Sequence, residues 1–337
     1  MKAYEVQNVA GVNQFKRTEL PQPSPGCRQV LIKVKAVSIN DRDRMIAKGV
    51  YPFALSLPLI PLSDGVGEVV ALGDGVTRVK LGDRVCGNFV QKWVSGELSE
   101  WMTKFTLGSI LPGLLAEYAV LDEESLVQVP EHLTDEEAAT LPSAALTAWH
   151  SLLTEGGLQA GDTVLLQGTS AVSLFALQFA HFAGARVIIT SSSDAKLSRV
   201  KELGASDVIN YKQTPDWEEQ VLQLTQGRGV DYVVEMSGGA SLAKSMQVVR
   251  LGGTILMVGA QAVSDAGINA LQFILGRIRL RGILTPGHRE SFEAMNRAIS
   301  IAKLRPIVDS VFEFEQAQEA FDYMNQGKYF GKISIRV

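Results

Sequence analysis

Gly168 opens a short segment whose residue types are suited to binding phosphate. The segment reads Gly168-Thr169-Ser170-Ala171-Val172-Ser173 and lies between an apolar run at 163–167 and a helical pattern that ends at Gly184. The N-terminus of a helix presents unpaired N–H groups, and serine hydroxyls can add hydrogen bonds to a phosphate. A second apolar run at 185–190 completes a strand–turn–helix–strand unit, the first half of a dinucleotide-binding fold. We therefore expect five residues to bind a dinucleotide here: Gly168, Thr169, Ser170, Ala171 and Val172.

This turn departs from the G-x-G-x-x-G fingerprint of dinucleotide-binding folds. Ser170 stands where the backbone approaches the pyrophosphate, and Ser173 stands where helix and strand pack closely. A side chain in place of glycine would keep the pyrophosphate slightly farther from the backbone, so the hydrogen bonds to it would be longer. Each charge-assisted hydrogen bond contributes about 1.5–3 kcal/mol. We predict cofactor affinity that is weaker than usual but not absent; the alternative is a βαβ unit that binds no nucleotide.

The end of the second strand predicts which cofactor is bound. Enzymes that use NAD place Asp or Glu about 20 residues after the glycines, where it holds the ribose 2′-OH. This chain has Ser191, Ser192 and then Lys196 there, and hydroxyls with a cation suit a 2′-phosphate. We predict that NADPH binds at least about tenfold more tightly than NADH. Asp194 is acidic and close by, and we expect it to cap the following helix.

Composition limits the class of protein. The chain has 337 residues, enough for about two domains, and a net charge of −4, so no basic field indicates nucleic acid. Its two cysteines, Cys27 and Cys86, do not suggest a disulfide framework. The N-terminus lacks the apolar region of a signal peptide, and the apolar stretches are too short to span a bilayer. We expect a soluble, cytoplasmic protein with no membrane or nucleic-acid partner.

The order of the elements predicts an α/β protein with three segments. Residues 1–130 contain short strands punctuated by Gly and Pro, which is typical of a barrel. Residues 131–286 alternate strands with helices, which indicates a parallel sheet covered on both faces. Residues 287–337 return to mixed structure. The segment 89–113 carries Trp93 and Trp101 and is expected to be either a lid or a surface excursion.

The order of these three segments resembles that of the medium-chain dehydrogenase/reductase superfamily along nearly the whole chain. The resemblance implies a GroES-like β-barrel catalytic domain at 1–130, an inserted Rossmann NADP-binding domain with a doubly wound parallel sheet at 131–286, and a C-terminal return to the catalytic domain at 287–337. The matching stretches are AVSINDRD at 36–43, SDGVGEV at 63–69, LGDRV at 81–85, GLLAEY at 113–118, LPSAALTAW at 141–149, LGA at 203–205, GG at 252–253 and FGK at 330–332.

The resemblance also implies site residues. In similar reductases, an Asn and a Tyr at the positions of Asn40 and Tyr51 lie beside the substrate, and Ser63 is a further candidate for the same site. Tyr51 is the expected hydrogen-bond or proton donor, with a packing role beside Pro52 as the alternative. Further residues are expected to bind the cofactor: Thr147, Tyr211, Gly259 and Lys332.

Comparison with the zinc-dependent members of this superfamily shows that this sequence lacks their zinc ligands. Where the zinc-dependent members hold their metal with Cys, His and Cys, this chain has Asn40, Ser63 and Ser143, with Asp64 beside Ser63. Zinc prefers thiolate, imidazole or carboxylate ligands. The segment 89–113 has none of the four cysteines of a structural-zinc lobe. We therefore expect a protein without zinc, similar to the quinone and enone reductases.

These observations predict a zinc-independent, NADPH-dependent reductase of quinones or α,β-unsaturated carbonyls. A conjugated substrate delocalises the developing negative charge, so hydrogen bonds can replace a Lewis acid. An NADP-linked alcohol dehydrogenase without zinc and a catalytically silent nucleotide-binding protein are the alternatives. The pattern at 278–284 predicts an exposed edge strand and hence a homodimer.

Overall fold

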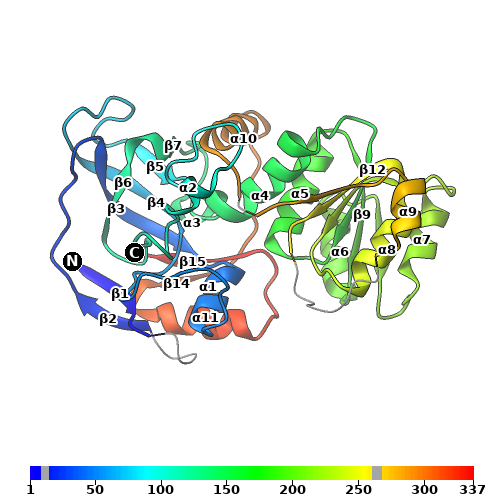
Figure 1. Cartoon of the computed structure of the whole chain (residues 1–337). Helices are drawn as coiled ribbons and strands as arrows, with labels where there is room; N and C mark the ends of the chain where they lie inside the picture. Colours follow the sequence, from blue (N-terminus) through cyan, green and yellow to red (C-terminus); the bar gives the residue numbers. More distant parts are fainter. Residues whose placement is uncertain (9–14, 260–267, 285) are drawn as a thin grey trace. The chain divides into compact units, whose positions relative to one another are not determined.

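Two compact units divide the chain in the computed structural model, which describes residues 1–8, 15–259, 268–284 and 286–337 (Figure 1). The first, called here the barrel unit, comprises Met1–Leu146 and Thr285–Val337. The second, the Rossmann unit, comprises Thr147–Leu284. Within the described residues, no helix is long and apolar enough to cross a membrane.

The barrel unit is built on a seven-stranded sheet to which both ends of the chain contribute. Its path runs β14 (Val308–Glu313), β15 (Lys332–Arg336), β3 (Gln29–Ser38), β4 (Asp64–Leu72), β5 (Arg84–Gly87) and β7 (Leu126–Gln128), and β6 (Tyr118–Asp122) pairs with β3. A separate hairpin joins β1 (Lys2–Val6) to β2 (Phe15–Glu19). The C-terminal β15 lies antiparallel to β3, so the tail completes the barrel that the N-terminal strands begin. The predicted GroES-like barrel is confirmed.

The barrel unit also contains several helices. They are α1 (Asp41–Ala47), α2 (Glu100–Thr103), α3 (Asp135–Ala138), α10 (Arg289–Ala302) and α11 (Ala317–Asn325). A capping box begins α3, because the Thr134 N–H donates to Glu137 and the Glu137 N–H donates to Thr134. In the segment that was expected to be a lid or a surface excursion, Trp93 is buried and Trp101 is exposed.

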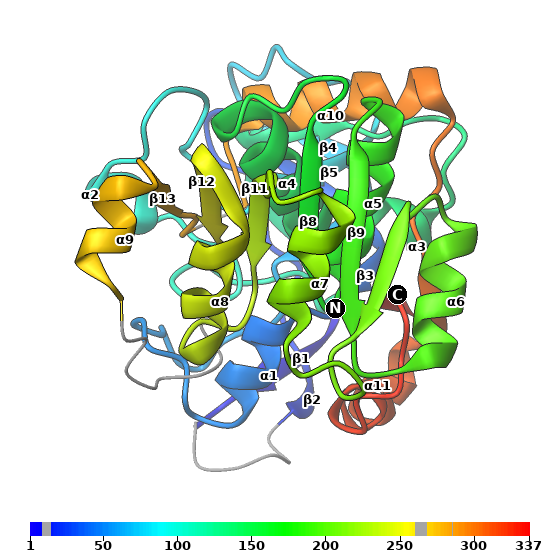
Figure 2. The same ribbon diagram turned by 90° about the vertical axis from the view of Figure 1, so that its right-hand side faces the viewer.

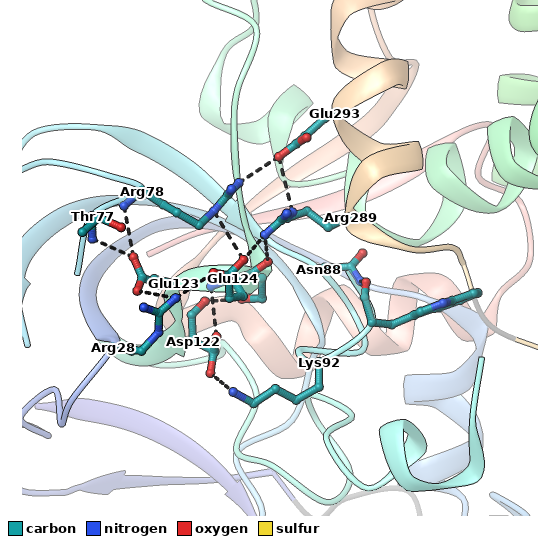
Figure 3. A network of polar contacts seen from close by, with 12 residues as sticks. Arg28, Thr77, Arg78, Asn88, Lys92, Asp122, Glu123, Glu124, Arg289 and Glu293 are labelled. Atoms are coloured by element: carbon teal, nitrogen blue, oxygen red, sulfur yellow. Dashed lines mark hydrogen bonds and ion pairs between the residues drawn. The ribbon is translucent and has the colours of Figure 1, made fainter. Parts of the chain in front are cut away.

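A polar network fastens α10 to the N-terminal part of the barrel unit (Figure 3). Glu123 is fully buried in the 3-10 turn η1 (Glu123–Ser125), and its carboxylate accepts the N–H groups of Thr77 and Arg78 at 2.8 and 3.0 Å. Arg289 at the start of α10 pairs with Glu124. These contacts join segments that are far apart in the sequence, and they hold the C-terminal return in place.

The Rossmann unit contains a six-stranded parallel sheet (Figure 2). Its order is β10 (Asp207–Asn210), β9 (Arg186–Ser191), β8 (Thr163–Gln167), β11 (Val230–Glu235), β12 (Val249–Met257) and β13 (Arg279–Gly282). This is the 3-2-1-4-5-6 order of a doubly wound fold, which places a ligand crevice beyond the carboxyl ends of β8 and β11. The predicted fold class is confirmed.

Helices α5 (Ala171–Phe182), α6 (Asp194–Glu202), α7 (Trp217–Leu224), α8 (Ala240–Val248) and α9 (Ala270–Leu275) connect these strands. The helix α5 buries an apolar stripe that includes Phe175, Ala176 and Phe179. A helical segment at 141–155 has three parts: Leu141–Ala145, α4 (Leu146–Trp149) and His150–Glu155, the first and last in π geometry.

Candidate active site

The turn after β8 places a glycine with positive φ shortly before the N-terminus of a helix. Gly168 has a φ of +70°, and a Cβ placed there would meet no atom within 4 Å. The conformation favours glycine, and the open space leaves room for a ligand. Ser170 is the N-cap of the twelve-residue helix α5, so the helix N-terminus faces the same turn. Gly168, Thr169 and Ser170 thus form the turn, and Ala171 and Val172 begin α5.

The two serines of this turn stabilise it internally. The Ser170 hydroxyl oxygen accepts the Ser173 N–H at 3.2 Å and lies 3.0 Å from the Ser173 hydroxyl. Ser173 is fully buried and donates its hydroxyl proton to the Gln167 carbonyl at 2.9 Å. The Ser173 hydroxyl thus donates within the protein, whereas Ser170 is exposed at the start of the helix.

Beneath the turn lies a buried carboxylate that the sequence analysis missed. Glu235 ends β11 and is fully buried. Its carboxylate accepts Gln167 Nε2 and the Ser245 hydroxyl, each at 2.6 Å, and the N–H groups of Ser237 and Gly238, each at 3.0 Å. The sequence signal that could have identified Glu235 is a charged residue at the end of a mostly apolar strand. This network fixes the adjoining ends of β8 and β11, where the crevice of the fold lies.

The residues predicted to hold a 2′-phosphate gather beyond the ends of β9 and β10. Asn210 pairs in register with Ser191, and the Tyr211 N–H donates to the Ser191 carbonyl at 3.1 Å. Ser191 is buried and Ser192 half-buried, and the Tyr211 side chain is 41% exposed. Lys196 follows in the first turn of α6.

The expected cap of α6 is wrong by one residue. Ser193, not Asp194, is the N-cap, and its hydroxyl oxygen accepts the Lys196 N–H at 3.4 Å. The two carboxylate oxygens of Asp194 instead accept the side-chain amides of Asn210 and Gln213, each at 2.7 Å. Partners that lie well beyond the helix, at the end of β10, outweigh the local capping preference of aspartate.

Two other predicted cofactor residues lie elsewhere in the Rossmann unit. Gly259 follows β12, and a Cβ on it would lie 2.3 Å from the Met236 carbonyl oxygen, so the close approach of these segments requires glycine. Thr147 lies half-buried in α4. Lys332, the remaining predicted cofactor residue, lies in the barrel unit at the start of β15.

In the barrel unit, α1 places Asn40 at its N-cap. The Asn40 backbone N–H donates to Asp43 at 2.9 Å, which is one half of a capping box. Asp43 thus lies at the start of α1 and contributes to its cap. The Asn40 side chain also faces a buried lysine, because Lys332 Nζ lies 2.6 Å from Asn40 Oδ1. Within the described residues, the buried NH2 group of Asn40 has no hydrogen-bond partner.

Asp64 connects the other residues at the positions of the missing zinc ligands. It is fully buried, and it accepts the hydroxyls of Ser63 at 2.9 Å and Ser143 at 2.5 Å and the N–H of Ser143 at 3.0 Å. Lys332 Nζ lies 3.9 Å from its carboxylate. The structure therefore joins Asn40 and Ser63 in one buried cluster, through Lys332 and Asp64.

Burial shifts the pKa values of Asp43 and Lys332. It raises the pKa of Asp43 to about 6, although the Arg42 guanidinium and the Asn40 N–H offset part of the rise. Burial also lowers the pKa of Lys332, while the carboxylates of Asp64 and Asp43 oppose that change. The Asp43 carboxyl group, with its raised pKa, lies directly beside the N-cap that carries the candidate substrate-binding amide.

Tyr51 lies beside this cluster, joined to it by Arg42. The Arg42 guanidinium lies over the rings of Tyr51 and Phe89, at 5.1 and 4.8 Å from their centroids, and contacts Asp43 at 3.4 Å. In the described residues, the Tyr51 hydroxyl makes no hydrogen bond. The adjacent loop exposes several large apolar side chains: Val50, Phe53 and Leu57.

Zinc does not fit this set of donors. Zinc is held by thiolate, imidazole or carboxylate, whereas Ser63 and Ser143 present hydroxyls that already donate to Asp64. The Lys332 ammonium, 2.6 Å from Asn40 Oδ1, would also repel a second cation. Throughout the part of the chain that the structure describes, no group of three or more His, Cys, Asp or Glu residues is arranged to hold a metal.

Two domain families match this chain. The alcohol dehydrogenase GroES-like domain matches residues 26–131, and the zinc-binding dehydrogenase domain matches residues 171–300. A zinc-type alcohol dehydrogenase-like protein of Schizosaccharomyces pombe is 40% identical, over 98% of this chain and 97% of its own length. The human quinone oxidoreductase is 27% identical over 97% and 94%.

Solved structures show the same relationship. A proposed alcohol dehydrogenase from Sinorhizobium meliloti 1021 has a TM-score of 0.93 and 37% identity, covering 100% of this chain and 98% of that chain. An NAD-dependent alcohol dehydrogenase has a TM-score of 0.89 and 32% identity, with both chains covered fully. The chain belongs to the medium-chain dehydrogenase/reductase superfamily. It is an oxidoreductase of a family that uses a nicotinamide dinucleotide.

Proposed function

We propose that this protein is a zinc-independent, NADPH-dependent reductase of quinones or α,β-unsaturated carbonyls. The observation that carries the proposal is the Asn40 amide, whose NH2 group is buried and unpartnered within the described residues, while its oxygen contacts the buried Lys332 ammonium. An unsatisfied buried donor costs about 1–3 kcal/mol, so a ligand oxygen is its natural partner.

The nicotinamide supplies the hydride when it is bound. The turn at 168–172 would hold the pyrophosphate against the start of α5, with Ser191, Ser192, Lys196 and Tyr211 around the 2′-phosphate. In the barrel unit, the Asn40 NH2 group would donate to the substrate oxygen as negative charge develops there. Tyr51 would donate its hydroxyl to the same oxygen and supply the proton that completes reduction. Ser63 acts by holding Asp64, since its hydroxyl donates to that carboxylate.

A conjugated substrate suits donors of this strength. Reduction of a quinone or an enone spreads the negative charge over the conjugated system, so neutral hydrogen-bond donors can stabilise it. The apolar side chains of Val50, Phe53 and Leu57 beside Tyr51 offer a surface for such a substrate. The test is optical measurement of NADPH oxidation with 1,4-naphthoquinone, an enone and a simple aldehyde. Turnover of the aldehyde alone would reject the proposal.

An alcohol dehydrogenase without zinc is the second candidate. The names of the relatives favour it, because the 40% identical protein is called alcohol dehydrogenase-like and the quinone oxidoreductase is 27% identical. In that case the Tyr51 hydroxyl or a serine would donate to an unconjugated alkoxide. The aldehyde and its alcohol would then be the best substrates in the same assay.

NADPH is expected to bind at least tenfold more tightly than NADH, which is about 1.4 kcal/mol. The reason is the group of hydroxyls with Lys196 beyond β9, together with an Asp194 carboxylate that already accepts two amides. Replacing Lys196 by alanine should narrow the difference, measured by calorimetric titration of both cofactors. Lys201→Ala, an exposed cation in the last turn of the same helix, is the control and should leave the ratio unchanged. Equal affinities in the wild type would reject the assignment.

The protein is expected to form a homodimer through the edge strand β13. All four residues of β13 are exposed, β13 ends the sheet, and the preceding helix exposes large apolar side chains. These include Leu271, Ile274 and Leu275 of α9, each more than 60% exposed. An unpaired edge with an apolar flank favours pairing with its own copy about a two-fold axis.

Light scattering at micromolar concentration measures this. The wild type should have twice the chain mass of 36.5 kDa, and the double variant Leu275→Asp with Leu280→Asp should have the mass of one chain. Ile301→Asp, at an exposed position on α10 in the other unit, should remain a dimer. A wild type that is monomeric at this concentration contradicts the prediction.

A further inference from the structure

Lys332 is a buried lysine whose ammonium group lies against the candidate substrate-binding amide. The residue is 2% exposed at the start of β15. Its Nζ donates to Asn40 Oδ1 at 2.6 Å and to the Ile39 carbonyl at 2.8 Å, with an Asp64 carboxylate oxygen at 3.9 Å. A buried charge is costly unless acceptors surround it. This cost indicates that the ammonium does more than fill space.

The ammonium determines how the Asn40 amide is turned. An ammonium group has three donors and no acceptor, so the amide atom at 2.6 Å must be the oxygen. The NH2 group then faces the other way, where it has no partner among the described residues. If the amide were rotated by half a turn, its oxygen would face the substrate oxygen, and two acceptors would repel each other.

The carboxylates around Lys332 have other partners. Asp64 accepts two serine hydroxyls and the Ser143 N–H, and Asp43 accepts the Asn40 N–H and contacts Arg42. At 2.6 Å, Asn40 Oδ1 is the closest acceptor to the ammonium, ahead of the Ile39 carbonyl at 2.8 Å. Asn40 and Lys332 are 292 positions apart in the sequence, and β15 brings them together.

We propose that Lys332 is a positioning residue, which holds Asn40 Oδ1 so that the Asn40 NH2 group donates to the substrate oxygen. This inference rests on the proposed function of Asn40. The positive charge also polarises the amide and strengthens its N–H as a donor while charge develops on the substrate. Lys332 acts through Asn40, in contrast to the sequence-based expectation that it binds the cofactor.

A double-mutant cycle separates these two roles. Steady-state kinetics with NADPH and 1,4-naphthoquinone would compare the wild type, Lys332→Met, Asn40→Ala and the double variant. Lys332→Met should lower kcat about tenfold or more and leave the KM for NADPH unchanged, and it should cause no further loss once Asn40 is alanine. Independent losses in both backgrounds, or a raised KM for NADPH in both, would overturn the proposal.

The conservative variant tests whether charge or volume is what matters. Methionine matches lysine closely in size without its charge, whereas arginine is larger and keeps a cationic donor. The proposal predicts that Lys332→Arg retains more of the wild-type kcat than Lys332→Met does. The reverse order would show that Lys332 only packs, and that result would also overturn the proposal.

Nuclear magnetic resonance gives a readout that does not depend on turnover. In the protein labelled with 15N-asparagine, the Asn40 side-chain signals are assigned by their loss in Asn40→Asp. Lys332→Met should shift these signals, whereas the other asparagine side chains stay in place; unshifted Asn40 signals contradict the proposal. A wild type that reduces none of the acceptors rejects the proposed function as well, whereas an active wild type with an equally active Lys332→Met rejects the positioning role alone.

Discussion

Replacing Asn40 by alanine is expected to lower kcat for 1,4-naphthoquinone by about 100-fold, the usual effect of removing one preorganised donor to a developing oxyanion. The physical reason is that the Asn40 NH2 group is buried and unpartnered within the described residues, and is fixed by the contact of its oxygen with Lys332. The loss should appear in kcat, because the donor acts most strongly in the transition state. The KM for NADPH should not change.

Two further variants show whether the loss of kcat is due to the Asn40 NH2 group. Asn40→Asp keeps the size of the side chain and an oxygen facing Lys332, but it has no NH2 group, so it should be as slow as Asn40→Ala. Asn325→Ala removes an exposed asparagine at the end of α11 and should have wild-type kinetics. If Asn40→Ala keeps more than half of the wild-type kcat, the amide is not the donor to the substrate.

Replacing Glu235 by alanine is expected to lower the free energy of unfolding by about 3–5 kcal/mol, because it leaves several buried donors without an acceptor. Those donors are Gln167 Nε2, the Ser245 hydroxyl and the N–H groups of Ser237 and Gly238. The end of β8 should loosen with them, since Gln167 directly precedes Gly168. Urea unfolding followed by circular dichroism measures the loss of stability.

Glu235→Gln and Glu219→Ala calibrate this effect. Glutamine keeps one acceptor oxygen but directs an NH2 group at other donors, so an intermediate loss is expected. Glu219 is exposed on α7, and its replacement should change the free energy of unfolding by less than about 0.5 kcal/mol. A Glu235→Ala protein as stable as the Glu219→Ala control would show that the buried network does not hold the sheet together.

The fold could be predicted wherever the determining interactions are local. Strand periodicity predicts residues 30–37 and 231–234 as strands, and both lie within observed strands, β3 and β11. The sequence pattern at 131–156 predicts one helix, but the structure divides this segment into short pieces, with Pro142, which lacks an N–H, at the start of the first π segment. The cap of α6 was assigned to the wrong residue because the partners of Asp194 lie at the end of β10.

The candidate site depends on contacts that no local pattern encodes. The turn at Gly168 and the residues beyond β9 follow one another closely in the chain, so residue types and spacing indicate them. Asn40 and Tyr51 were named through the family resemblance. The contact between Asn40 and Lys332 and the acceptor role of Glu235 require the sheet pairings to be known, since each joins distant segments.

Reduction without zinc is tested by measuring metal content and NADPH-dependent naphthoquinone reduction on the same sample, before and after treatment with a chelator. We expect less than about one-tenth of a zinc per chain, because Asn40, Ser63 and Ser143 replace the zinc ligands, and a rate that the chelator does not change. One tightly bound zinc per chain, with activity that is lost on its removal and restored on its return, would contradict this expectation.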